Sequence, residues 1–454
     1  AGGGTWTNHA SIMNVAIGNY SMDAALSAAT ANTALGYNTL TALTTGDYNT
    51  AIGSYAMALH TTGDANIGLG VNALTSLLTG TRNIAIGNNA MYDLDAGSTA
   101  QDSDDNVFIG YTAGGGTWAN NKSEFNVAIG NYVMDGALNA ANHNIALGYK
   151  ALSATSYEGD YNIAIGSEAA TQMTDQTANV AIGHQALSGS NSGESYNVAI
   201  GHNAMKTLDG SGHDNNIAIG AYAMDDTGTT GGTENIFIGK TAGGGTWATA
   251  ASSYNVAIGN HAMNAAMNGA LRNTAVGYDT LGVLTTGDDN VAVGNASLSA
   301  LTTGTYNTAV GTYALQVNTA NSNTAFGYAT GTQNVFIGKS AGHYATTTTY
   351  SVFIGYHAGY NQKIASNGNV HIGWTAGQYA SGSDNTFIGK QAGQGGITSA
   401  PFSTGTNNTV VGREAFKSFT TATGNTIVGD AAGDAMTTAD NSVIMGYAAG
   451  SAIT

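Results

Sequence analysis

This chain lacks, or nearly lacks, several residues on which protein chemistry often depends. Of its 454 residues none is Cys, one is Pro and 9% are charged, against roughly 25% charged in an ordinary globular chain. The absence of Cys excludes disulfides, thiolate metal sites and a cysteine nucleophile. Lys and Arg number 11 against 28 Asp and Glu, for a net charge of −17. Because such a chain repels phosphates, we expect it to bind neither nucleic acid nor an anionic membrane surface.

Two kinds of segment are also missing. No apolar run approaches the ~18 residues of a membrane-spanning helix, so we expect no membrane insertion. The first residues, AGGGTWTNHA, contain no basic stretch followed by an apolar one, so we expect no signal peptide.

A five-residue motif, Asn-x-Ala-x-Gly, is what the sequence has in quantity. It recurs 25 times, from NVAIG at Asn14 through NTAIG at Asn49 to SVIMG at Ser442, and most copies start 16 to 20 residues apart. No stretch of the chain escapes the pattern. We therefore predict one continuous repeat domain over residues 1–454, with no linker and no separate catalytic domain.

Each copy of the motif predicts a short strand. In the copy at Asn49, Thr50 and Ile52 would share one face, and Ala51 and Gly53 the other. A second extended segment is predicted at residues 56–59, followed by a turn at residues 62–64. Helical periodicity is not sustained over the length of a helix. The sequence therefore predicts an all-β fold, a parallel β-solenoid or β-roll of about 25 coils of 17–18 residues.

With the motif's first residue as position one, positions three and nine vary together. Where position three is Ala or Gly, position nine is Leu, Met or once Ala in 15 copies; where position three is bulky, position nine is Gly in eight of nine copies. A close-packed interior tolerates exchanges that conserve volume, so we predict that the two positions share one internal compartment. Representative pairs are Ala16 with Met22, Phe108 with Gly114, Phe237 with Gly243, and Phe336 with Gly342.

A longer repeat lies over the short one. The segment AGGGTW occurs at residues 1–6, 113–118 and 242–247, and it divides the chain into super-repeats of roughly 1–112, 113–241 and 242–333, followed by coils with a bulky position three at 334–454. Its glycines predict crowded turns or a tight contact between chains, since the Lys-Ser/Thr of a phosphate loop does not follow them. Neither end of the array looks capped, so we expect further fibre segments to stack end to end.

The pattern Asn-x-Ala-x-Gly-x-x-Ala resembles the head repeats of trimeric, YadA-like autotransporter adhesins. It resembles still more the repeats of phage tail-fibre proteins, in which copies read NTAIGYxAL with TTG turns. The match is carried over essentially the whole chain by copies such as NTALGYNTL (32–40), NTAIGSYAM (49–57), NIALGYKAL (144–152) and NTAVGTYAL (307–315). The resemblance implies parallel β-coils assembled as an obligate homotrimeric fibre on a virion or cell surface.

Candidate metal ligands are few and scattered. Only His184 and His202 occupy the same place in adjacent coils, where a solvated stack is favoured over a metal site. Asp-rich turns at residues 62–64, 102–105 and 286–289 could recruit Ca²⁺, but Asp is also an ordinary turn residue. No catalytic motif is recognisable. We therefore predict no enzyme activity, no catalytic or metal site and no cofactor, with Ca²⁺ as the one alternative.

Aromatic residues supply the candidates for ligand contact. The four Trp are Trp6, Trp118, Trp247 and Trp374, and many of the 23 Tyr directly follow the motif Gly. These rings could stack on a cell-surface glycan, although packing at a subunit seam or over a loop is the favoured alternative. The Asn at position one is interpreted as an internal hydrogen-bonded ladder.

Together these features predict an extracellular structural and adhesive fibre shaft. The favoured form is the shaft of a phage tail fibre, a homotrimer that supports attachment to a host receptor. A bacterial surface adhesin of the trimeric autotransporter type is the alternative. An ice-binding solenoid ranks below both, because Thr lies mostly in irregular turns and not in a flat Thr-x-Thr array.

Overall fold

The structure, a computed structural model of the chain, describes residues 11–92, 102–118, 121–154, 156–190, 193–208, 212–228, 232–247, 250–316, 321–327, 334–345, 348–362, 366–396 and 402–452. All named elements within these ranges are β-strands, and none is an α-helix. The chain divides into two compact units, residues 1–234 and 235–454, and each is described by itself. One continuous domain over the whole chain stays a prediction.

Each of the 25 motif copies forms a three-residue strand at its positions two to four. In the first unit these repeat strands are β1 (Val15–Ile17), β2 (Thr33–Leu35), β3 (Thr50–Ile52), β4 (Ile67–Leu69), β5 (Ile84–Ile86), β6 (Val107–Ile109), β7 (Val127–Ile129), β9 (Ile145–Leu147), β11 (Ile163–Ile165), β12 (Val180–Ile182), β13 (Val198–Ile200) and β15 (Ile217–Ile219). In the second unit they are β17 (Ile236–Ile238), β18 (Val256–Ile258), β19 (Thr274–Val276), β20 (Val291–Val293), β21 (Thr308–Val310), β22 (Thr324–Phe326), β23 (Val335–Ile337), β24 (Val352–Ile354), β25 (Val370–Ile372), β26 (Thr386–Ile388), β27 (Thr409–Val411), β28 (Thr426–Val428) and β29 (Val443–Met445). Four further strands of the first unit are β8 (Ala137–Leu138), β10 (Ser156–Tyr157), β14 (Thr207–Leu208) and β16 (Asp226–Gly228).

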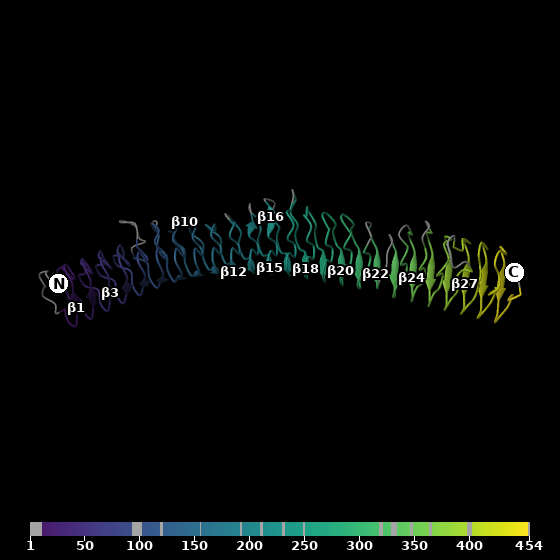
Figure 1. The fold of residues 1–454 in the computed structure, drawn as a ribbon, viewed down its shortest axis with the longest axis horizontal. Helices are drawn as coiled ribbons and strands as arrows, with labels where there is room; N and C mark the ends of the chain where they lie inside the picture. Colours follow the sequence, from purple (N-terminus) through teal and green to yellow (C-terminus); the bar gives the residue numbers. More distant parts are fainter. Residues whose placement is uncertain are drawn as a thin grey trace. The chain divides into compact units, whose positions relative to one another are not determined.

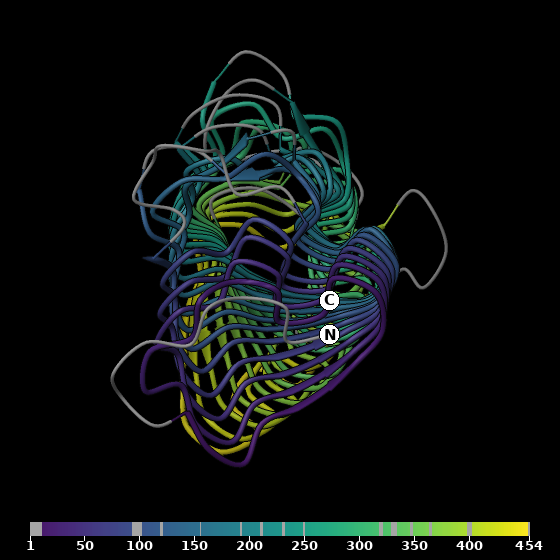
Figure 2. The ribbon, with the colours of Figure 1, turned by 90° about the vertical axis from the view of Figure 1, so that its left-hand side faces the viewer.

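Within each unit, successive repeat strands pair in parallel and position for position. Ala16 of β1 faces Ala34 of β2, and Phe336 of β23 faces Phe353 of β24. The coils therefore follow one another with one register (Figure 1), and the end-on view shows those of the first unit, purple to teal, nested as flattened loops (Figure 2). The predicted all-β parallel β-solenoid is confirmed. Elsewhere in the first unit, β8 pairs with β10 and β14 with β16, also in parallel.

The Asn side chains at position one form a buried ladder, as predicted. Asn49 Nδ2 donates to Asn32 Oδ1 at 3.1 Å and to the carbonyl oxygen of Gly63 at 2.8 Å. The backbone N–H of Asn49 donates to the same Asn32 Oδ1 at 2.9 Å, and Asn66 repeats these bonds on Asn49. Each amide therefore joins two coils and also fixes the turn of its own coil, which satisfies buried polar groups that water cannot reach.

The motif Gly is required by a close approach between coils. Gly36 has a φ of 146°, and a Cβ built there would lie 2.5 Å from the carbonyl oxygen of Gly53 in the next coil. Beyond this Gly the chain does not return to an extended conformation: φ is 60° at Tyr55 and 52° at Met57. The second extended segment predicted at residues 56–59 is therefore wrong, because left-handed residues interrupt it and residues 54–59 form turns.

Positions three and nine of one coil lie side by side in its interior. A Cβ built at Gly114 would lie 2.6 Å from Phe108 Cδ1. The same approach recurs between Phe237 and Gly243 at 2.8 Å and between Phe336 and Gly342 at 2.7 Å. All three Phe are fully buried, and in the first described coil Met22 is buried and Ala16 half-buried. A side chain at position nine therefore has no room where position three is Phe.

Trp118, at the end of an AGGGTW segment, is also an interior residue. Its ring packs against Phe108, with 5.6 Å between centroids, and its Nε1–H donates to the carbonyl oxygen of Gly114 at 2.9 Å. Trp247 makes the corresponding two contacts in its own coil. The AGGGTW segments at 113–118 and 242–247 therefore mark coils whose interior holds a Trp beside the Phe.

Candidate functional site

The outward side of the repeat strands is an apolar face. Positions two and four point outward and position three inward, as in β3, where Ala51 is buried and its neighbours are half-exposed. Position two is Val, Ile or Thr in every copy, and position four is Ile, Leu, Val, Phe or Met in every copy. Exposed examples are Leu35, Ile129 and Ile258 at 44%, 42% and 39%. We call positions two and four of the repeat strands of a unit its strand face; contiguous apolar surface of this kind marks an interaction site.

Tyr side chains line the margins of the strand face. Tyr48 and Tyr196, each directly before a motif Asn, are 65% and 61% exposed. On the other margin, after the motif Gly, four pairs of Tyr rings in the first unit pack edge to face. Tyr111 and Tyr132 lie 5.3 Å apart at 77°. In such a pair the edge of one ring contacts the face of the other. Each Tyr also combines an apolar ring with a polar hydroxyl, as aromatic residues at interfaces do.

The four Trp proposed for glycan contact have different surroundings. Trp118 and Trp247 are buried, at 0% and 2% exposure. Their assignment to glycan contact is therefore wrong, because the interior of the coil covers both rings. Trp374 is 46% exposed and remains a candidate. Trp6 lies outside the described residues.

The acidic turns considered for Ca²⁺ hold hydrogen bonds between coils. Asp64 Oδ1 accepts the backbone N–H of Asp47 at 2.7 Å, and Asp288 Oδ1 accepts that of Leu271 at 2.8 Å. Carboxylates at these turns therefore serve the stacking of coils, and Ca²⁺ binding there stays a prediction.

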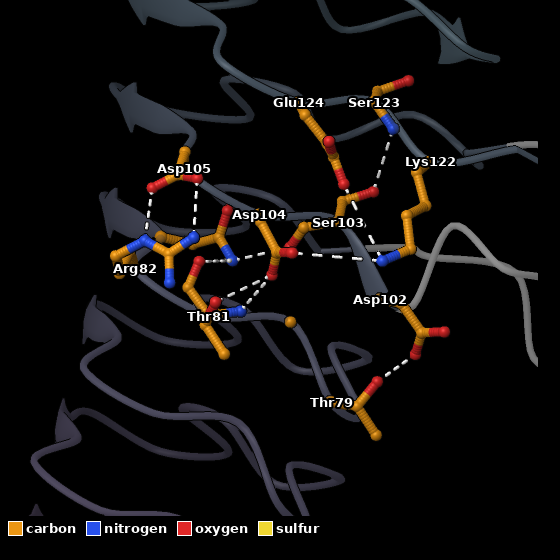
Figure 3. A network of polar contacts seen from close by, with 12 residues as sticks. Thr79, Thr81, Arg82, Asp102, Ser103, Asp104, Asp105, Lys122, Ser123 and Glu124 are labelled. Atoms are coloured by element: carbon orange, nitrogen blue, oxygen red, sulfur yellow. Dashed lines mark hydrogen bonds and ion pairs between the residues drawn. The ribbon is translucent and has the colours of Figure 1, made fainter.

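Residues 102–105 belong to a polar network that joins three coils of the first unit (Figure 3). Asp104 accepts the N–H of Thr81 at 2.6 Å and lies 3.9 Å from Lys122 Nζ. Arg82 binds Asp105 through two bonds of 2.6 and 2.8 Å, and this holds the pKa of the Asp105 carboxyl below its usual range. Within the described ranges no group of three or more His, Asp or Glu side chains is placed to hold a metal ion.

The His residues divide into surface and interior positions. His184 and His202 are exposed and stacked, 5.2 Å between centroids at 11°. His371 instead occupies position three, between the rings of Phe353 and Phe387, each 4.9 Å away. Complete burial lowers the pKa of His371 to about 3. Neither of its ring nitrogens has a hydrogen-bond partner among the described residues, so it fills the volume of a Phe as a neutral ring.

A groove of about 460 Å³ lies beside the AGGGTW segment at residues 113–118. It is lined by Gly116, Thr117, Asp135, Gly136, Ala137 and Ser153. Burial raises the pKa of the Asp135 carboxyl. Asp135 is the one carboxyl among these lining residues, so the groove does not offer the paired carboxylates of acid–base catalysis.

No family model, curated protein or solved structure matches this chain. The described residues include no helix with the length and apolar character that a membrane crossing requires. The likeness to phage tail-fibre and autotransporter repeats therefore stays a prediction.

Sequence reasoning singled out the interior pairs and the Trp but not position four. The sequence does distinguish the two outward positions: position four is apolar in every copy, whereas position two is Thr in some copies and Val or Ile in the others. An outward residue that is never polar indicates a surface that is covered in use.

Proposed function

We propose that this chain forms the shaft of a homotrimeric extracellular fibre, of the kind found in phage tail fibres, which holds a receptor-binding part away from the virion. The strand face carries the proposal. It runs along every coil of each unit, and burial against two further copies would remove its Ile, Val and Leu side chains from water. Interfaces of permanent assemblies are apolar in the same way.

The role we assign is mechanical and has no catalytic step. Parallel strand pairing, the Asn ladder and the filled interior repeat in successive coils of each unit. Each coil contacts chiefly its neighbours, as in other solenoids, so stiffness accumulates coil by coil. Such a body transmits force and presents few exposed backbone groups to proteases.

Two alternatives use the same fold differently. A bacterial surface adhesin would need a signal peptide and a membrane anchor in its gene, whereas a tail fibre would be encoded with a chaperone or a virion-attachment domain. An ice-binding surface would need a regular array of outward Thr. Position two of the strand face is Thr in eight copies and Val or Ile in the other 17, which does not favour ice binding.

The test is a pair of charge substitutions on the strand face. Ile182→Lys with Ile200→Lys places two ammonium groups at position four of adjacent strands, where burial of unpaired charge is costly. The control, Tyr161→Lys with Tyr196→Lys, adds the same charge to exposed margin residues. We expect light scattering to give a smaller mass for the first variant only. Equal masses for both variants and the parent protein would remove the strand face as the subunit interface.

A further inference from the structure

Acidic residues are spread along the chain except in one long segment. Residues 290–383 contain no Asp or Glu, although the chain has 28. Lys339 lies within this segment and Lys390 follows it closely. The second unit therefore carries a region with excess positive charge in a chain whose net charge is −17, and local charge of one sign attracts ligands of the other.

Two aromatic rings lie between these lysines. Position six of four successive coils is occupied by Lys339, Tyr356, Trp374 and Lys390. The rings of Tyr356 and Trp374 stack on one another, at 11° with 6.3 Å between centroids, and the two residues are 40% and 46% exposed. We call these two rings the aromatic platform.

Each ring of the aromatic platform has an ammonium group near it. Lys339 Nζ lies 5.9 Å from the Tyr356 centroid, and Lys390 Nζ lies 5.3 Å from that of Trp374. Neither lysine forms an ion pair with a described residue. Their charges are therefore available to a ligand that lies on the rings.

The aromatic platform is held in place by rings behind it. His357 stacks on Tyr356 at 4.0 Å and 11°, and it stacks in turn on Tyr360 at 4.3 Å. Rings fixed in this way lose little freedom when a ligand binds.

We infer that Tyr356 and Trp374, with Lys339 and Lys390, form a binding site for an acidic polysaccharide, that is, a chain of uronic-acid units. The apolar C–H groups of the sugars would pack against the exposed sides of the aromatic platform, and their carboxylates would meet the two ammonium groups. Coils are ~4.8 Å apart, so the four positions span roughly 14 Å, the length of a short run of sugar units. The inference rests on the proposed function, because a shaft outside the cell would meet surface polysaccharide.

The experiment is calorimetric titration of the 454-residue chain with an alginate hexamer, which carries a carboxylate on every sugar, and with neutral maltohexaose. We expect the alginate hexamer to bind, maltohexaose to bind far more weakly, and binding to weaken in high salt. Trp374→Ala should weaken binding about 10-fold, with Trp374→Phe restoring most of it. Lys339→Gln with Lys390→Gln should weaken binding about 5-fold. Lys240→Gln is the control, since Lys240 holds position six of another coil of the second unit.

Light scattering of each variant separates this inference from the proposed shaft. Loss of alginate binding by Trp374→Ala at unchanged mass supports the site. No binding by the parent protein, equal binding of both hexamers, or unchanged binding by Trp374→Ala overturns it. A smaller mass for Trp374→Ala also overturns it, because the ring would then belong to a subunit seam. A monomeric parent protein that still binds alginate through Trp374 would keep the site and overturn the homotrimer.

Discussion

A coil from each unit shows how two interiors fit one backbone. The coil at Asn49 holds Ala51 and Met57 at positions three and nine, and the coil at Asn334 holds Phe336 and Gly342. Both strands pair in register with their neighbours, and φ at position nine is 52° in the first and 59° in the second. The same backbone conformation therefore accepts a large side chain at either position three or position nine, provided that the combined side-chain volume of the two positions is conserved.

The rings at the outer margins of the coils pack in more than one way. In the first unit, Tyr111 and Tyr132 pack edge to face, whereas Tyr161 lies parallel to His143. In the second, Tyr356 and Trp374 lie nearly parallel with a lysine near each. A solenoid constrains the residues that meet inside each coil, and it leaves margin residues free to acquire a ligand.

The largest expected effect comes from emptying a Phe-type interior. Phe108→Ala should lower the free energy of unfolding by ~3–5 kcal/mol, because it leaves a cavity in a closely packed coil. Adding Gly114→Leu converts the coil to the Ala type and should recover part of that loss. Chemical denaturation of the two variants measures both. Without recovery, positions three and nine would not share a compartment.

Breaking the buried Asn ladder should cost somewhat less. Asn49→Ala leaves the carbonyl of Gly63 and the N–H of Asn66 without their partner, at about 3 kcal/mol for the buried groups together. The control is Asn89→Ala, which removes a bond of 3.0 Å to Asn72 in a part-buried ladder. Denaturation should show a clearly smaller loss for Asn89→Ala. Equal losses would mean that burial does not decide the value of these ladders.

His371 should make the second unit sensitive to acid. Its pKa is about 3 when folded and about 6.5 in an unfolded chain. Below pH 6.5 the unfolded chain therefore binds a proton that the folded chain does not. The free energy of unfolding then decreases by ~1.4 kcal/mol for each pH unit by which the pH is lowered, a loss of about 2 kcal/mol at pH 5. His371→Phe extends the Phe column and should flatten the dependence between pH 7 and pH 5. If both proteins lose the same stability over that interval, His371 is not the group responsible.

The smallest effect is expected at the exposed ion pairs. Arg82→Gln removes both bonds to Asp105, but the Arg82 side chain is 59% exposed, and exposed pairs contribute little. Its melting temperature by circular dichroism should stay close to that of the parent protein. A large drop would show that the polar network of residues 79–124 acts as a unit.

Periodicity was enough to predict the interior and the strands. The motif located all 25 repeat strands, and the Asn at position one predicted the ladder, because both features repeat with the coil. The chain after the motif Gly was mispredicted because its left-handed residues, such as Tyr55 and Met57, are not Gly or Asn. Trp118 looked like a surface ring because a super-repeat does not reveal that it packs on Phe108. The aromatic platform depends on ring orientations, which spacing alone does not fix.

The most direct test of the homotrimer is the mass of the unsubstituted 454-residue chain in solution, measured by light scattering over a range of concentrations. One chain is 45.6 kDa. The proposed homotrimer predicts a particle of three times that mass at every concentration, with and without a calcium chelator. A stable particle of a single chain would contradict it, because the strand face would then be left in water.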